Sequence, residues 1–189
     1  MKHKAISYGA ALVILLAAWH LGSLALQKPF LPTPLASIQA FVELWRHEDM
    51  GTHFLISAYR VIASIVLAVI FAVPLGLVMG RSEKVDRLLS PMVYLLYPLP
   101  KVVFLPIIVV LMGLGNKPKI LLIALVVFFQ IAVVTRDAAK AIPKASEQSM
   151  RSLSATTGQM YRHLILPYCL PKILTSLRVT LGTAIAVLF

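Results

Sequence analysis

Few residues of this chain could do chemistry, and those few lie within otherwise apolar segments. Lys101 follows Pro98 and Pro100, and Gln130 lies inside another apolar run. Prolines leave backbone carbonyls without a helical partner, and at membrane depth such groups must face protein or a water-filled cavity. We therefore interpret Pro98, Pro100, Lys101 and Gln130 as candidates for the wall of a path across a membrane.

Each of these residues also has a simpler explanation. The prolines could make a kink that serves only helix packing. Lys101 could extend its side chain to the inner membrane surface. Gln130 could form an interhelical hydrogen bond without any ligand. The sequence leaves these alternatives open.

Catalytic and metal-binding motifs are absent from the sequence. It contains no glycine-rich phosphate loop, no nucleophile elbow and no paired-histidine zinc motif. Its single cysteine, Cys169, excludes an internal disulfide and any multi-cysteine metal site. The formal charge of +11 could indicate nucleic-acid binding, but the basic residues flank apolar runs and form no continuous patch. We expect no enzyme activity, no bound cofactor or metal and no nucleic-acid partner.

A polar, basic segment over residues 148–171 interrupts the apolar runs and reads QSMRSLSATTGQMYRHLILPYCLP. Residues from Lys144 to Leu153 predict a short amphipathic helix with Met150 and Leu153 on one face. We interpret these two side chains as the exposed apolar tip of a docking site for a soluble partner. The alternative is a helix that rests on the lipid surface.

The second half of this segment predicts another short helix. Thr156 or Thr157 can cap its start, and the apolar pattern continues to Leu166. Pro167 and Pro171 are then expected to stop the helix and redirect the chain. Together the two helices would form a compact projection at the membrane surface.

The remainder of the chain has the composition of a membrane protein. It is 59% hydrophobic and only 13% charged, whereas soluble domains are about one quarter charged. The pattern predicts a single all-α domain over residues 1–189, a polytopic helical bundle with four complete membrane spans and an incomplete fifth. The predicted spans are about 5–27, 60–80, 88–113, 119–136 and 173–189.

Both ends of the chain allow two interpretations. The N-terminal run resembles a signal peptide, but its 23 charge-free residues exceed the usual length and favour an uncleaved first span. After Arg178 only 11 charge-free residues follow, which we interpret as a truncated span. A short re-entrant helix is the alternative.

The distribution of positive charge predicts the orientation of the spans. With the N-terminus in the cytoplasm, twelve Lys and Arg residues lie on the inner side, five lie on the outer side, and Lys101 lies within a span. Because cytoplasmic segments collect Lys and Arg, this orientation is favoured. Residues 137–172 then form a cytoplasmic loop. Residues 28–59 form an outer stretch, in which Ser37 can cap a short amphipathic helix through Leu44.

Several segments, in this order and spacing, resemble the inner-membrane permease subunits of bacterial ATP-driven (ABC) importers. The resemblance covers nearly the whole chain and is nearest to the branch that handles sulfonates, taurine and nitrate. It implies a type I permease bundle in the bacterial inner membrane. The matching segments are Phe30-Leu-Pro-Thr-Pro34, Pro74-Leu-Gly-Leu-Val-Met-Gly80, Tyr97-Pro-Leu-Pro100, Gly113-Leu-Gly115, Leu164-Ile-Leu-Pro167 and Leu181-Gly-Thr-Ala-Ile-Ala-Val-Leu188.

The resemblance also assigns a role to the polar loop. In that family the loop carries Glu-Ala-Ala, followed four positions after the final Ala by Gly, and docks into a cleft of the ATPase subunit. Here the aligned positions are Gln148-Ser149-Met150 and Ser154, and Glu147 lies one residue early. The coupling residues that this alignment implies are Glu147, Gln148, Ser149, Met150, Leu153, Ser154, Ala155, Leu166, Pro167 and Pro171.

The resemblance further implies the partners and the activity. Two permease chains would form the path as a homodimer, ATP would be bound by separate ATPase subunits, and an extracytoplasmic binding protein would deliver the substrate. That substrate would be a small anion such as a sulfonate, taurine or nitrate. Two alternatives are a truncated, non-transporting remnant of such a permease and a fragment of a secondary transporter.

Overall fold

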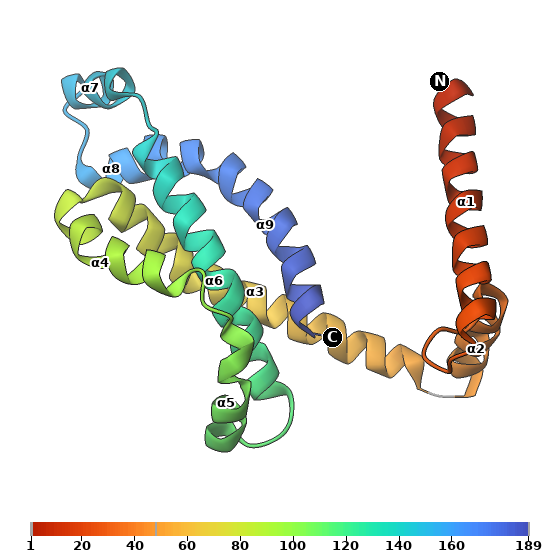
Figure 1. Cartoon of the computed structure of the whole chain (residues 1–189). Helices are drawn as coiled ribbons and strands as arrows, with labels where there is room; N and C mark the ends of the chain where they lie inside the picture. The colour runs from red at the N-terminus through yellow and green to blue at the C-terminus, as the bar shows by residue number, and fades with distance from the viewer. Residues whose placement is uncertain (1, 48, 189) are drawn as a thin grey trace. The chain divides into compact units, whose positions relative to one another are not determined.

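The structure is a computed structural model that describes residues 2–47 and 49–188, and within these ranges it contains helices and connecting turns but no β-strand (Figure 1). It forms two compact units, divided between Leu55 and Ile56. The helices are α1 (Lys2–Leu26), α2 (Pro34–His47), α3 (Met50–Arg81), α4 (Glu83–Leu96), α5 (Leu105–Met112), α6 (Asn116–Lys140), α7 (Lys144–Ser152), α8 (Thr157–Met160) and α9 (Leu166–Leu188). A 3-10 turn, η1 (Lys101–Phe104), precedes α5, and a π-helical turn, η2 (Tyr161–Ile165), joins α8 to α9.

Four helical segments are long and apolar enough to cross a membrane: Ser7–Leu26, Met50–Arg81, Asn116–Lys140 and Thr157–Leu188. A further pair of helices, Glu83–Leu96 and Lys101–Met112, is long and apolar enough when taken together, but the two are bent by 85° relative to each other. The predicted class, a polytopic all-α membrane bundle, is confirmed. The third predicted span, over 88–113, falls on this bent pair, in which the chain turns sharply at Pro98 and Pro100.

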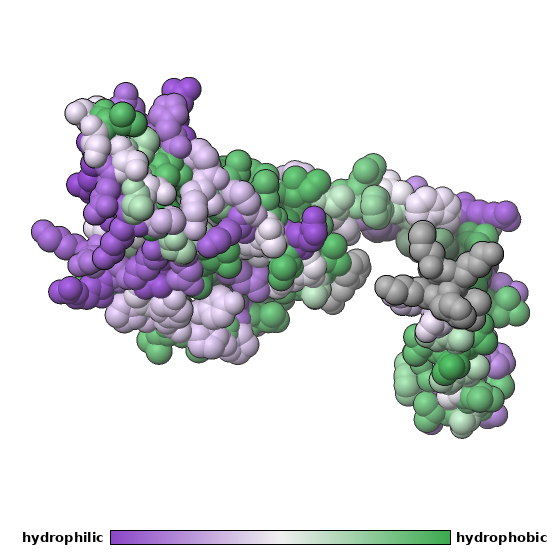
Figure 2. All heavy atoms as spheres, turned by 90° about the horizontal axis from the view of Figure 1, so that it is seen from above, coloured by the Kyte–Doolittle hydropathy of each residue, from purple (hydrophilic) through white to green (hydrophobic). Residues whose placement is uncertain are grey.

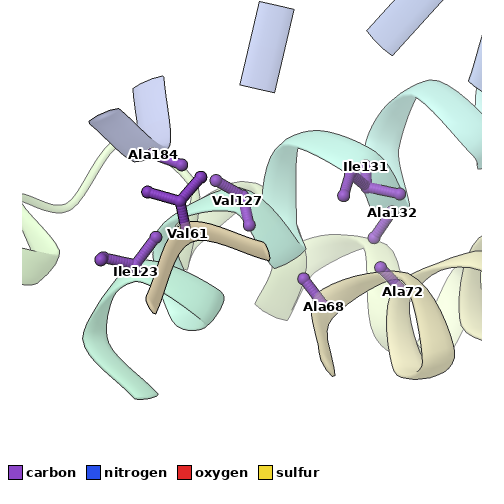
Figure 3. Close-up of a cluster of buried hydrophobic side chains, with 8 residues drawn as sticks. All are labelled: Val61, Ala68, Ala72, Ile123, Val127, Ile131, Ala132 and Ala184. Atoms are coloured by element: carbon purple, nitrogen blue, oxygen red, sulfur yellow. The ribbon is translucent and has the colours of Figure 1, made fainter. Parts of the chain in front are cut away.

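Helices α3, α6 and α9 build the core of the second unit. Figure 3 shows small and β-branched side chains of α3 and α6 facing one another, with one alanine of α9 beside them. These buried residues are Val61, Ala68, Ala72, Ile123, Val127, Ile131, Ala132 and Ala184. Small side chains allow helix axes to approach closely, which is how helices associate where lipid removes the hydrophobic driving force.

Two glycines set the distance between α3 and α6. A Cβ atom at Gly76 would lie 2.6 Å from the carbonyl oxygen of Ala132 and 2.7 Å from Cβ of Thr135. One turn later, a Cβ atom at Gly80 would lie 2.5 Å from Cβ of Ala139. Both contacts are too short for any side chain, so this Gly-x-x-x-Gly pair holds the two helices at backbone contact.

Helix α9 differs from the prediction at its start. Pro167 and Pro171 were expected to stop a helix, but Pro167 occupies the second position of α9 and Pro171 lies inside it. The π-helical turn η2 directly precedes Pro167, and such local adjustments let a helical run tolerate a proline without ending. The helical run from Thr157 to Leu188 is long and apolar enough to cross a membrane, and α9 begins at Leu166, before the predicted start of the fifth span at 173.

Two helices of the predicted outer stretch begin earlier than expected. Helix α2 begins at Pro34, and the hydroxyl of Thr33, not that of Ser37, accepts a hydrogen bond from the backbone N–H of Ala36 at 3.3 Å. Proline is favoured in the first helical turn, which explains the early start. Helix α3 begins at Met50, ten residues before the predicted start of the second span.

Candidate functional site

The docking segment, which we define as α7 together with α8 and the turn between them, lies at one end of the second unit. Figure 2 shows hydrophilic side chains gathered at this end, which carries α4, α7 and α8. Beneath the segment is a buried apolar cluster in which side chains of α3, α6 and α9 meet side chains of α8, η2 and the loop after α6. Its members are Leu77, Ala138, Ala139, Ile142, Met160, Ile165, Cys169 and Ile173. The docking segment is therefore seated on the three helices of the core.

A left-handed residue follows the end of helix α7. The backbone N–H of Ala155 donates to Met150 O at 3.2 Å, and that of Ser154 donates to Arg151 O at 2.9 Å. These two bonds form a Schellman motif, whose turning position favours glycine. Ser154 occupies that position with a φ of 54°. The glycine that the family pattern has at this point is thus explained by backbone geometry, and serine holds the same turn under strain.

An ion pair fastens α7 to the end of α3. Arg81 Nη1 lies 2.6 Å from Glu147 Oε1, and both side chains are 18% exposed. The guanidinium group donates a hydrogen bond to the carboxylate and holds the pKa of Glu147 below its ordinary value, against the opposing effect of burial. Glu147 therefore contacts the protein's own α3.

The second half of the docking segment starts as predicted. Thr156 accepts from the backbone N–H of Gln159 at 3.3 Å, and Gln159 Oε1 accepts from the backbone N–H of Thr156 at 2.8 Å. This reciprocal pair is a capping box and confirms Thr156 as the cap.

The expected apolar tip is only half confirmed. Leu153 is 79% exposed. Met150 is half-buried and packs on the cluster beneath the segment, as Ala155 does. The prediction placed Met150 on the exposed tip, but its side chain points into the apolar support. The other implied coupling residues are exposed: Gln148, Ser149, Ser154, Leu166, Pro167 and Pro171.

A cleft of about 560 Å³ lies along α6 and α9. Gln130 lines it, and the Oε1 atom of this side chain is buried without a hydrogen-bond partner among the described residues. Most of the wall is apolar, with hydroxyl groups and one ammonium group. The lining residues are Tyr97, Gln130, Val133, Val134, Pro171, Lys172, Thr175, Ser176, Val179 and Thr180.

The predicted path residues do not form one site. Only Gln130 lines the cleft. Pro98 and Pro100 lie in the exposed turn before η1. Lys101 is 8% exposed; its ammonium group donates to the carbonyl oxygen of Tyr97 and lies 4.8 Å from the centre of the Phe129 ring. Lys101 therefore does not extend to the protein surface, and it does not line the cleft.

A polar cluster between α4 and α6 was not predicted. Arg136 donates to both carboxylate oxygens of Asp86, with Nη2 and Oδ2 at 2.8 Å. Lys140 donates to the same carboxylate, and Ser90 Oγ donates to Asp86 Oδ1 at 2.6 Å. Arg136 also donates to the hydroxyl of Tyr94 at 2.9 Å. From the sequence, Arg136 and Lys140 were interpreted only as residues that set the orientation of the membrane spans. No local spacing pattern could pair residues that lie fifty positions apart.

Comparison with known proteins extends this description. Residues 72–188 match the family described as "Binding-protein-dependent transport system inner membrane component". The taurine transport system permease protein TauC of Escherichia coli (strain K12) is 33% identical, over 96% of this chain and 68% of TauC. The formylaminopyrimidine transport permease protein ThiX of Halalkalibacterium halodurans is 24% identical, over 97% of this chain and 74% of ThiX. The chain spans about two thirds of the length of several curated relatives.

Proposed function

This chain belongs to the family of binding-protein-dependent transport system inner membrane components, and from that premise we propose that it lines the substrate path of an ATP-driven importer. The docking segment receives a cytoplasmic ATPase, which binds the ATP. A second permease chain completes the path, and an extracytoplasmic binding protein supplies the substrate. Membership of this family argues against the alternative of a secondary transporter.

The observation that carries this proposal is the seating of the docking segment. Its underside packs in a cluster that it shares with α3, α6 and α9, and Glu147 ties α7 to Arg81. Its outer surface presents Leu153 among polar side chains. A force applied to α7 would therefore act on the three core helices together, as rigid-body coupling requires.

Leu153 provides the sharpest test of docking. We expect Leu153→Asp to abolish co-purification with the ATPase, because a carboxylate at the exposed tip cannot enter an apolar groove. Leu114→Asp is the matched control. Leu114 is 92% exposed and lies in the turn before the first residue of α6, whereas the docking segment follows the last residue of α6. Unchanged association of the Leu153 variant would refute the docking role. Met150→Asp is unsuitable, because Met150 packs inward.

We propose that the cleft along α6 and α9 forms part of the path and that a small anion such as taurine, another sulfonate or nitrate passes it. The amide of Gln130, the hydroxyl of Ser176 and the ammonium group of Lys172 can donate hydrogen bonds to such an anion. The name of TauC supports taurine.

Uptake of labelled taurine by cells that produce the permease with its ATPase and binding protein tests the path. Gln130→Leu should lower uptake without loss of protein from the membrane, whereas Lys101→Met, outside the cleft, should lower the amount of folded protein. Normal taurine uptake by the Gln130 variant would remove this residue from the path.

The orientation follows from the same proposal. The N-terminus and the docking segment lie in the cytoplasm of a bacterial cell with the chain in its inner membrane. A cysteine placed at Ser154, in a Cys169→Ala background, should react with an impermeant thiol reagent only in inside-out vesicles. Reaction in intact spheroplasts would reverse the orientation and exclude docking to a cytoplasmic ATPase.

A further inference from the structure

We propose that α2 lies along the membrane–water interface at which α1 ends, with its apolar face in the lipid. This inference concerns the first unit only and is independent of the proposed transport function. It depends on how the chain returns after α1 and on the distribution of side chains around α2.

The linker between the two helices folds back along α1. The indole Nε1 of Trp19 donates to Pro32 O at 3.0 Å, and the hydroxyl of Ser23 donates to Leu31 O at 2.7 Å. Helix α1 ends at Leu26, so these two bonds hold the linker about 5–10 Å before the end of the span, at a rise of about 1.5 Å per residue. Helix α2 thus begins at the depth of the last two turns of α1.

That depth is the boundary between headgroups and acyl chains, where interfacial helices lie. Helix α1 is apolar on all sides, and its leucines are exposed over most of its length. In a helical membrane protein such a helix is surrounded by lipid or other apolar surface. The start of α2 therefore lies beside a membrane span and adjoins the same lipid or apolar surface that surrounds α1.

The side chains of α2 separate into two faces. Ile38, Phe41 and Trp45 follow helical spacing on one side, and each is more than half exposed within the first unit. Glu43 and Arg46 are exposed outside this apolar arc. An indole and a phenyl ring beside charged residues are the composition of a helix that lies in the interface, since aromatic rings concentrate at headgroup level. A fully aqueous position would leave this apolar face in water.

Spin labels on the two faces test the proposal in the full chain, reconstituted in phosphatidylcholine vesicles. In a Cys169→Ala background, Phe41→Cys places a label on the apolar face, and Ala40→Cys places one about 100° further around the helix, outside that face. Power saturation then compares access by oxygen, which partitions into lipid, with access by a water-soluble nickel chelate. We expect the label at 41 to show a several-fold higher oxygen-to-nickel ratio than the label at 40.

Other placements give other results. Equal access by nickel at both positions would mean that α2 lies in water. Protection of the label at 41 from both reagents would mean that a protein surface covers it. High oxygen access at both positions would mean that α2 is immersed in the bilayer. Each of these results overturns the proposal. If either variant does not stay monodisperse, Ile38→Cys and Glu43→Cys replace the pair on the same two faces.

Discussion

Helix α6 has two very different sides. Toward α3 it is packed at backbone contact by Gly76 and Gly80, and toward α4 its Arg136 is held by the carboxylate of Asp86. Toward α9 it borders a cleft lined by Gln130, whose buried amide oxygen has no hydrogen-bond partner among the described residues. One side is sterically and electrostatically complete, whereas the other keeps space and unused hydrogen-bonding capacity. The comparison teaches that rigidity and a candidate binding surface can be built on opposite sides of a single helix.

Among substitutions on the packed side of α6, we expect the largest loss of stability from a change in the polar cluster between α4 and α6. Asp86→Asn leaves the cations of Arg136 and Lys140 without their shared carboxylate, and loss of one member of a buried pair costs about 3 kcal/mol of unfolding free energy. Denaturant titration in detergent micelles measures this loss of unfolding free energy. The control is Asp137→Asn, since Asp137 also pairs with Arg136 but is 56% exposed and should matter little. Equal losses from the two variants would contradict this ranking.

We expect the second largest loss of stability from a change at the contact between Gly76 and α6. A methyl group at Gly76 meets a carbonyl oxygen of α6 at 2.6 Å, so Gly76→Ala must separate the helices and should cost about 2 kcal/mol. Gly182→Ala in α9 is the matched control, because no atom lies within 4 Å of that Cβ position. It should be neutral or slightly stabilising. Thermal unfolding followed by circular dichroism compares the two, and similar melting temperatures would refute tight packing at Gly76.

The ion pair beneath the docking segment should make stability depend on pH. The pKa of Glu147 is lowered in the folded protein, so its contribution is present above the pKa of the unfolded chain and is lost as the pH falls through the lowered value. Glu147→Gln should remove about 1.5 kcal/mol at neutral pH and reduce the loss of stability in acid. Glu83→Gln, at an exposed first-turn carboxylate of α4, serves as the control. An acid transition that is identical in the Glu147 variant and the parent chain would exclude this role.

The smallest effect should be a gain at the end of α7. Ser154→Gly removes the penalty of a left-handed serine and should stabilise the protein by about 1 kcal/mol. Ser152→Gly, two residues earlier within the helix, should instead destabilise it. Proteolysis within the docking segment is a sensitive measurement, and faster cleavage of the Ser154 variant would contradict the assignment of the turn.

Local patterns predicted much of this molecule. Apolar run length identified the helical membrane class, and Thr156 was among the caps recognised from residue type, since threonine is favoured at the start of a helix. The failures have physical reasons as well. Pro167 was taken as a helix stop, although a preceding π-helical turn lets the helical run continue through it. The inward orientation of Met150 depends on residues from three other helices, and the partner of Asp86 lies fifty positions away, so no local pattern contains them.

Helix α9 has a mechanical consequence. It runs without interruption from Leu166, near the docking segment, past Thr180 in the wall of the cleft. These two residues are about 21 Å apart along the axis at 1.5 Å per residue. A tilt of such a helix at one end becomes a sideways displacement at the other. The width of the cleft can therefore change when α9 pivots, while the shared boundary of α3 and α6 stays fixed.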